Sequence, residues 1–142
     1  MELLEVLTVG LPFCGFKVLA GLSLTGPAGL LLIGLGAVDA IVNGVNLAGL
    51  LVSGRRPLAA CAFAHATGSL RKAGPLAKRR DLGASLDVLL SFALVALMIG
   101  LGRLGSLPHA QLVAWNFCVI FNVLGAGLGR FGASLRDLAR GV

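Results

Sequence analysis

The sequence predicts an all-α integral membrane protein with four transmembrane helices arranged as two helical hairpins. Of its 142 residues, 57% are hydrophobic and only 13% are charged, and the mean hydropathy is +0.95. A soluble domain carries about 25% charged residues, so this composition is typical of a polytopic membrane protein. The apolar residues fall in four long segments separated by shorter polar or basic connections. We therefore expect one membrane domain, residues 1–142, without a separate soluble domain.

The four predicted spans cover about residues 3–22, 28–52, 85–104 and 111–129. The first span contains Pro12 and Lys17, so both a kinked span and a helix lying on the membrane surface fit it. The third span, SLDVLLSFALVALMIGLGRL, is the most uniformly apolar. We expect Asp87 at the beginning of its helix, where the helix dipole favours an anion.

The connection at residues 54–82 is strongly basic. It holds seven of the twelve basic residues: Arg55, Arg56, Arg71, Lys72, Lys78, Arg79 and Arg80. Such an excess indicates a cytoplasmic loop, and four spans then place both termini in the cytoplasm, with the protein in the inner membrane of the cell. Between Pro57 and Pro75 the loop allows a short amphipathic surface helix. The expected contacts of the basic residues are anionic lipid headgroups or a partner protein, and nucleic acid is not expected because no aromatic residues alternate with the basic ones.

An acidic residue, Asp39, lies near the middle of the second span. On a helical wheel Asn43 and Asn46 share its side of the helix. A carboxylate at the bilayer centre costs roughly 2.5–3.5 kcal/mol, so Asp39 marks a functional site or a buried polar contact. In the first case Asp39 coordinates a cation or carries a proton. In the second, which we favour, it is protonated or paired and only holds helices together. Lys17 in the first span is the expected partner.

Small residues mark the expected helix-packing faces. In the second span Gly36, Ala40, Gly44 and Ala48 recur every four residues and allow another helix to approach closely. Val38, Ile41, Val42 and Val45 form the arc that we expect to face lipid. In the fourth span Asn122, Gly125 and Gly129 share a face, and there Asn122 is expected to hydrogen-bond a neighbouring helix.

The two halves of the chain allow a weak two-helix internal repeat. The pattern N-x-x-G occurs late in the second helix of each half, at Asn46–Gly49 and Asn122–Gly125. Such a repeat implies a pseudo-twofold axis along the membrane normal. Chance matches are frequent in a chain with many Leu and Gly residues, so the sequence leaves the repeat open.

Residues for catalysis, metal binding or cofactor binding are not found in a usable pattern. Both histidines, His65 and His109, fall in connections, and the three cysteines form no C-x-x-C pair. We therefore expect neither an enzyme nor a metal or cofactor site. Our first hypothesis is a non-enzymatic accessory or structural subunit of a larger inner-membrane complex, associating with other subunits or with itself. The alternative is a small oligomeric transporter or channel with a polar path lined by Asp39, Asn43 and Asn46.

Overall fold

The described part of the chain is helical and contains no strand. The computed structural model describes residues 2–59, 61, 62, 64 and 76–139. In chain order its elements are α1 (Glu2–Glu5), the π-helical turn η1 (Val6–Gly10), α2 (Leu11–Ser23), α3 (Pro27–Ser53), α5 (Leu76–Gly100), the 3-10 turn η2 (Arg103–Ser106) and α6 (His109–Ala139). The all-α class is confirmed for these residues.

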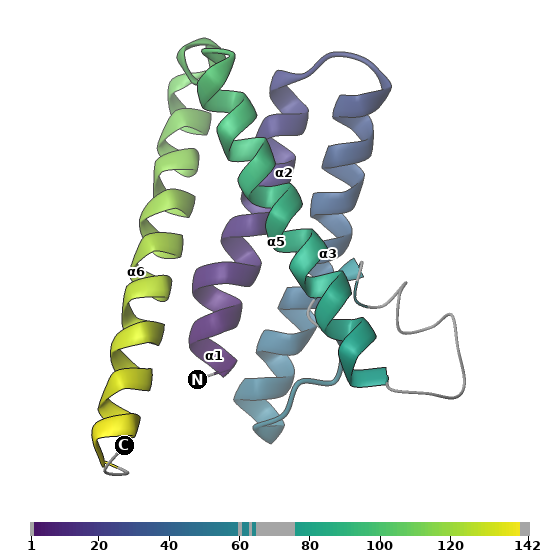
Figure 1. Cartoon of the computed structure of the whole chain (residues 1–142). Helices are drawn as coiled ribbons and strands as arrows, with labels where there is room; N and C mark the ends of the chain where they lie inside the picture. The colour runs from purple at the N-terminus through teal and green to yellow at the C-terminus, as the bar shows by residue number, and fades with distance from the viewer. Residues whose placement is uncertain (1, 60, 63, 65–75, 140–142) are drawn as a thin grey trace.

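The helices form a bundle with two distinct ends (Figure 1). At one end lie the start of α1, the end of α3, the start of α5 and the end of α6. We call it the basic end, because Arg55 and Arg56 follow α3 there and three basic residues, 78–80, lie near the start of α5. The opposite end, where residues 24–26 and 101–108 connect the helices, is called the turn end.

Among the described residues, three helices are long and apolar enough to cross a membrane: Glu2–Ser23, Pro27–Ser53 and His109–Gly129. They correspond closely to three of the four predicted spans. The apolar part of α5, Ser85–Gly100, is shorter. At 1.5 Å per residue it extends about 24 Å, less than the roughly 30 Å of a hydrocarbon core. The described part of the fold is therefore all-helical, with helices long and apolar enough to span a membrane, while a count of four spans remains a prediction.

The first helix absorbs Pro12 without breaking. Proline has no N–H to donate to the carbonyl of the residue four positions earlier, here Thr8. The chain forms the wide π-helical turn η1 just before Pro12, and α1, η1 and α2 run on as one rod of 22 residues. The Thr8 carbonyl accepts a hydrogen bond from Asn122 Nδ2 of α6, at 3.4 Å. A π-turn next to an interrupted hydrogen-bond ladder is a common solution to such a defect.

Glycine and proline delimit α3. Pro27 occupies its first turn, where a missing N–H costs nothing, and Gly26 precedes it with a φ of +83°. At the other end Gly54 adopts a φ of +68° and donates its N–H to the Leu50 carbonyl at 3.1 Å. This left-handed residue ends the helix and turns the chain back toward the bundle.

The helix that contains the predicted third span begins earlier and ends earlier than residues 85–104. Helix α5 begins at Leu76, so residues 76–82 are helical, although we placed them in the loop 54–82. Leu, Ala, Lys and Arg favour helix. The loop was predicted there because of the charge of Lys78, Arg79 and Arg80. The helix ends at Gly100 instead of Leu104, because Gly102, with a φ of +63°, reverses the chain. The predicted amphipathic helix between Pro57 and Pro75 lies largely outside the described residues.

Helix α6 extends beyond the predicted fourth span, since residues 130–139 continue the helix to Ala139. Its neighbour in sequence, α5, leans away from it, so the two helices meet near the turn end and diverge toward the basic end (Figure 1). By contrast, α2 and α3 pack along each other. The two hairpins of the possible repeat therefore pack differently.

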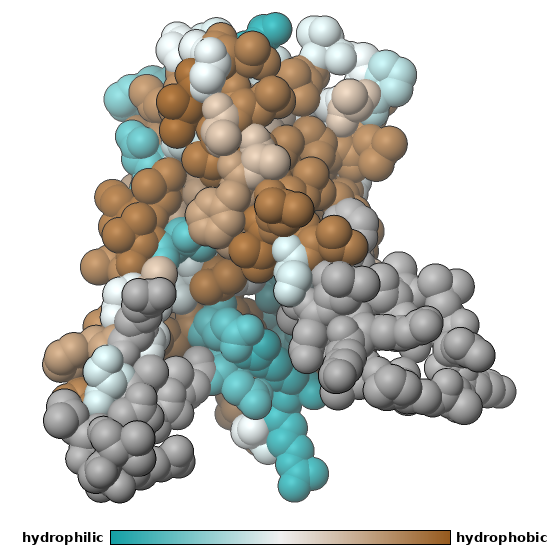
Figure 2. Space-filling view, in the orientation of Figure 1, coloured by the Kyte–Doolittle hydropathy of each residue, from teal (hydrophilic) through white to brown (hydrophobic). Residues whose placement is uncertain are grey.

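Helix α2 is the centre of the bundle, since it packs against α3, α5 and α6. The apolar core lies around it, toward the turn end: Phe13, Phe16, Leu19, Ala20, Leu94, Met98, Leu107 and Trp115. The Phe16 and Trp115 rings lie 4.9 Å apart between α2 and α6. Figure 2 shows hydrophobic side chains covering most of the coloured surface in this view, with hydrophilic ones at both ends and their largest group near the basic end. A surface of this kind is suited to lipid contact.

Gly125 allows α6 to approach η1 closely, and this contact generates a prediction. A Cβ atom at Gly125 would overlap Oγ1 and Cβ of Thr8, whereas at Gly127 it would meet no described atom within 4 Å. We expect Gly125→Ala to lower the free energy of unfolding by about 1–3 kcal/mol, because the Thr8 backbone must move. Thermal unfolding in detergent measures the change. The matched control Gly127→Ala should be neutral or slightly stabilising, and equal stability of both variants would contradict the contact.

Candidate functional site

The centre of the site is an ammonium group held between two carboxylates. Lys17 of α2 is fully buried, and its Nζ lies 2.5 Å from Oδ2 of Asp39 on α3. The same Nζ forms an ion pair with Oδ1 of Asp87 on α5. Asp39 is 1% exposed and the side chain of Asp87 is 10% exposed. Three helices thus contribute one ionisable residue each to a single buried cluster, which we call the charged triad.

A glycine on α3 makes room for the Lys17 stem. A Cβ at Gly36 would lie 3.1 Å from Lys17 Cβ and 3.0 Å from the Cys14 carbonyl oxygen, so α2 and α3 approach very closely at this level. Asp39 lies three residues further along α3, about one turn nearer the basic end. The Lys17 side chain therefore extends from its Cα toward the basic end to reach both acids.

The sequence interpretation missed Asp87. We placed it at the start of its helix, but α5 begins eleven residues earlier, at Leu76, so Asp87 lies three turns inside. The buried residues Asp87, Ser91, Leu94 and Met98 follow helical spacing and form the face of α5 that turns toward the protein. Proline commonly marks the start of a helix. A helix predicted to start directly after Pro75 would have placed Asp87 three turns inside it.

Asp39 and Asn46 also hold the chain segment that follows α3. Asn46 Oδ1 accepts the Leu58 N–H at 2.9 Å, and its Nδ2 donates to the Ala59 carbonyl at 3.2 Å. Asp39 Oδ1 accepts the Ala62 N–H at 2.7 Å. Since Asp39 lies fourteen residues before the end of α3, about 21 Å of helix, the chain after Ser53 folds back beside α3 (Figure 1). Non-helical backbone at such depth is tolerated where protein groups satisfy it, and here side chains of α3 do so.

Asn43 belongs to the same cluster. Its Nδ2 donates to the Asp39 carbonyl at 2.9 Å and lies 3.6 Å from the Cys14 sulfur. A Cβ at Gly10 would overlap Asn43 Oδ1, so Gly10 makes room for the amide. All three polar residues predicted on α3 are therefore buried, and each is bonded within the chain.

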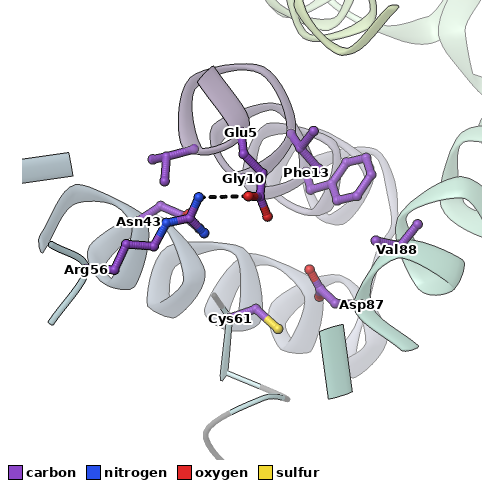
Figure 3. A pocket seen from close by; sticks show the side chains of 10 residues that line it. Glu5, Gly10, Phe13, Asn43, Arg56, Cys61, Asp87 and Val88 are labelled. Atoms are coloured by element: carbon purple, nitrogen blue, oxygen red, sulfur yellow. Dashed lines mark hydrogen bonds and ion pairs between the residues drawn. The ribbon is translucent and has the colours of Figure 1, made fainter. Parts of the chain in front are cut away.

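A small hollow of about 70 Å³ lies beside the charged triad (Figure 3). Its walls include Asn43, Cys61 and Asp87, and Glu5 and Arg56 lie on its outer side. Arg56 Nη2 lies 2.8 Å from Glu5 Oε2, which is largely exposed, and Nη2 also donates to the Glu2 carbonyl at 2.7 Å. The Glu5–Arg56 ion pair therefore borders the hollow where it meets the surface at the basic end.

The predicted packing residues are only partly covered by the chain itself. Gly36 packs against α2 and Gly125 against Thr8, while Gly129 shares with Gly125 a second hollow beside α1 and η1. Gly44 and Ala48 are exposed, and no described atom lies within 4 Å of a Cβ built at Gly44. Ala40 is half-buried. Asn122 bonds Thr8 and is not part of the charged cluster.

The predicted lipid-facing arc is wrong for one of its four residues. Val38, Ile41 and Val45 are exposed as expected, but Val42 is only 8% exposed. It lies between Asp39 and Asn46 on the buried face of α3, which follows the spacing 36, 39, 43, 46. The helical wheel assigned Val42 to the lipid-facing arc, although it lies on the same side of α3 as Asp39 and Asn46.

The basic residues predicted to contact headgroups or a partner differ in placement. Arg55 is exposed after α3, while Arg56 is engaged with Glu2 and Glu5. Three lie on the first turns of α5, namely Lys78, Arg79 and Arg80. Arg71 and Lys72 lie outside the described residues. Lipid contact by these residues stays a prediction.

The described residues contain no group of three or more His, Cys, Asp and Glu side chains placed to hold a metal ion. Compared with protein-family models, curated proteins and solved structures, the chain matches none. Its function is therefore argued from the site itself.

Removal of the ammonium should destabilise the protein strongly. Lys17→Met leaves two carboxylates buried without their cation, and we expect a loss of about 3–5 kcal/mol in the free energy of unfolding in detergent. The triple variant Lys17→Met, Asp39→Asn, Asp87→Asn removes the unpaired charges and should recover most of that loss. Arg55→Met, which removes an exposed cation, is the control and should change little. A stable Lys17→Met variant would contradict the role of the triad.

Loss of Asn46 should loosen the segment that follows α3. Asn46→Ala removes two hydrogen bonds to Leu58 and Ala59, worth about 1 kcal/mol each, so the segment should open about tenfold more often or more. Cys61, which is 4% exposed, reports this opening through its rate of maleimide labelling, read by mass spectrometry of its peptide. Asn116→Ala, at an exposed position of α6, is the control. Equal labelling rates in both variants would show that Asn46 does not hold the segment.

Proposed function

We propose that this protein is a non-enzymatic accessory or structural subunit of a larger membrane complex. One observation carries the proposal: the polar groups of α3 are engaged inside the chain, while the small-residue face of the same helix is left open at Gly44 and Ala48. Side chains that are already hydrogen-bonded are poor ligands for a substrate. A face of small residues without a neighbour is, in contrast, a suitable contact for another transmembrane helix.

The open face is continuous with the packed one. Gly36 contacts α2 nearer the turn end, and Gly44 and Ala48 continue the same four-residue spacing toward the basic end. A helix that lies against them would approach α3 as closely as α2 does at Gly36. The partner we propose is therefore a transmembrane helix of another subunit, with a second copy of this chain as the competing possibility.

We further propose four spans with the basic end in the cytoplasm. Arg55 and Arg56 follow α3 at that end, and residues 78–80, all basic, belong to the first turns of α5 there, as expected for a cytoplasmic face. In this arrangement α5 is the third span in chain order, added to the three longer helices, and its first turns extend beyond the hydrocarbon core. Both termini are then cytoplasmic, in the inner membrane.

A second candidate function is a small oligomeric transporter or channel. The path predicted along Asp39, Asn43 and Asn46 is occupied by internal hydrogen bonds, but Asp87 and the hollow beside it give the idea separate support. Ion flux into proteoliposomes that is lost in Asp39→Asn would favour this candidate over the accessory role.

The accessory role is tested by filling the open face. In Gly44→Leu the new Cβ meets no described atom of this chain within 4 Å and the side chain extends from the exposed face, so the fold should persist. We expect the partner that co-purifies with the wild-type chain in mild detergent to be reduced at least about fivefold, because loss of roughly 1 kcal/mol already has this effect. Quantitative mass spectrometry of the purified complex measures it.

The matched control is Gly127→Leu on α6, another exposed glycine with no described atom within 4 Å. It should retain the partner. If the wild-type chain purifies alone as a stable homo-oligomer that Gly44→Leu dissociates, the face joins copies of this chain and the accessory role is wrong. Equal partner recovery in both variants would show that the partner does not bind at this face.

A further inference from the structure

We propose that the charged triad binds a proton at Asp87, which exchanges with water through the hollow at the basic end. The inference goes beyond the accessory role and does not depend on any partner. It starts from the charge balance of the triad. Asp39 and Asp87 carry two negative charges against the one positive charge of Lys17, so the fully ionised triad has a net charge of −1 in a buried site. One additional proton makes it neutral, which lowers the cost of burial.

Asp87 is the acid that can accept this proton. Both oxygens of Asp39 are occupied, by Lys17 and by the Ala62 N–H. Asp87 uses Oδ1 for Lys17, and no described residue donates a hydrogen bond to its Oδ2. Its side chain retains 10% exposure and lines the hollow. A hydronium ion in the hollow can therefore transfer its proton to Oδ2, leaving a water molecule and a neutral carboxylic acid.

The hollow is large enough for water. A water molecule occupies roughly 30 Å³ in the liquid, so a volume of about 70 Å³ holds about two. Asn43 and Cys61 supply polar atoms on its wall, and Glu5 and Arg56 connect it to the exposed surface (Figure 3). Figure 3 shows Asp87 on the wall across from the Glu5–Arg56 ion pair.

The described residues close the site toward the turn end. Toward the turn end the space beyond the triad is filled by the apolar core, in which Phe13, Phe16 and Trp115 are each at most 3% exposed. Apolar side chains give water no partner, so a continuous water path across the bundle is absent from this arrangement of the described residues.

A second polar group independently points to the site. Ser91 is fully buried, and its hydroxyl has no hydrogen-bond partner among the described residues. It lies one turn beyond Asp87 on the same face of α5, at the distance where helical neighbours interact. An unpartnered buried hydroxyl is costly, and a water molecule bonded to Asp87 would satisfy it. A metal cation fits less well, because hard cations take about six or more oxygen ligands and Asp87 and Ser91 offer few.

Other titratable or charged groups surround Asp87 from every neighbouring element. They are Lys17 and Cys14 on α2, Asp39 on α3, Cys61 and Arg56 after α3, and Glu5 on α1. Infrared spectroscopy separates a protonated acid from the thiols, the ammonium and the guanidinium, because only a carboxylic acid has its carbonyl stretch, and the Asp87→Asn variant separates Asp87 from Asp39 and Glu5.

The experiment records infrared difference spectra of the full chain in lipid during a pH titration. We expect one buried carboxylic acid band that is absent in Asp87→Asn and unchanged in Glu2→Gln, which removes an exposed acid. Ser91→Ala should move the titration midpoint by at least about half a pH unit, threefold in proton affinity. Because this variant keeps the triad, it tests the proposal even where Asp87→Asn fails to fold. Absence of the band, or a band and midpoint unchanged in both variants, would overturn the proposal.

Transfer into D2O tests the route, since deuteration shifts the same band. Val88 lines the hollow, and the larger side chain of Val88→Phe should narrow it. We expect this variant to slow the exchange several-fold. Val123→Phe, at an exposed position of α6, should leave the rate unchanged. Equal exchange rates in the two variants would show that the proton does not travel through the hollow.

Discussion

One ammonium group joins three helices of this bundle, and most of the remaining structure can be traced to it. Lys17 lies on α2, which among the described helices packs against α3, α5 and α6 alike. Its two carboxylate partners come from α3 and α5, so the ion pairs fix the depth of both helices relative to α2. In a membrane interior, where apolar contacts between helices gain little over contacts with lipid, such polar contacts select one arrangement among many.

Asp39 also links the helices to the chain segment that folds back after α3. Asp39 accepts a bond from Lys17 on one oxygen and from the Ala62 N–H on the other. Asn46, about two turns nearer the basic end, accepts the Leu58 N–H of the same segment. The segment then supplies Cys61 to the wall of the hollow. A disturbance of the charged triad would therefore reach the entrance of the hollow through only a few bonds. This coupling follows from placing several acceptors on one helix face.

The sequence predicted the parts of this fold that depend on local chemistry. Hydropathy located three spanning helices to within a few residues, and the periodicity of α3 put Asp39, Asn43 and Asn46 on one side. The length of α5 was misjudged because charge was given more weight than helix propensity, and with it the position of Asp87 was lost. The fold-back after α3 was beyond any local pattern, since it depends on side chains twelve or more residues earlier in the chain.

The second carboxylate separates a structural contact from a site that can change state. A single Lys17–Asp39 pair would be neutral and would suffice to join α2 and α3. Adding Asp87 introduces a buried charge that the ammonium cannot neutralise, which costs stability unless a proton or water shares the site. Asp87 is also the member of the triad that keeps some exposure, and it faces the hollow, whereas Lys17 and Asp39 are sealed. The excess charge thus lies where solvent can reach it, which is the arrangement required for reversible protonation.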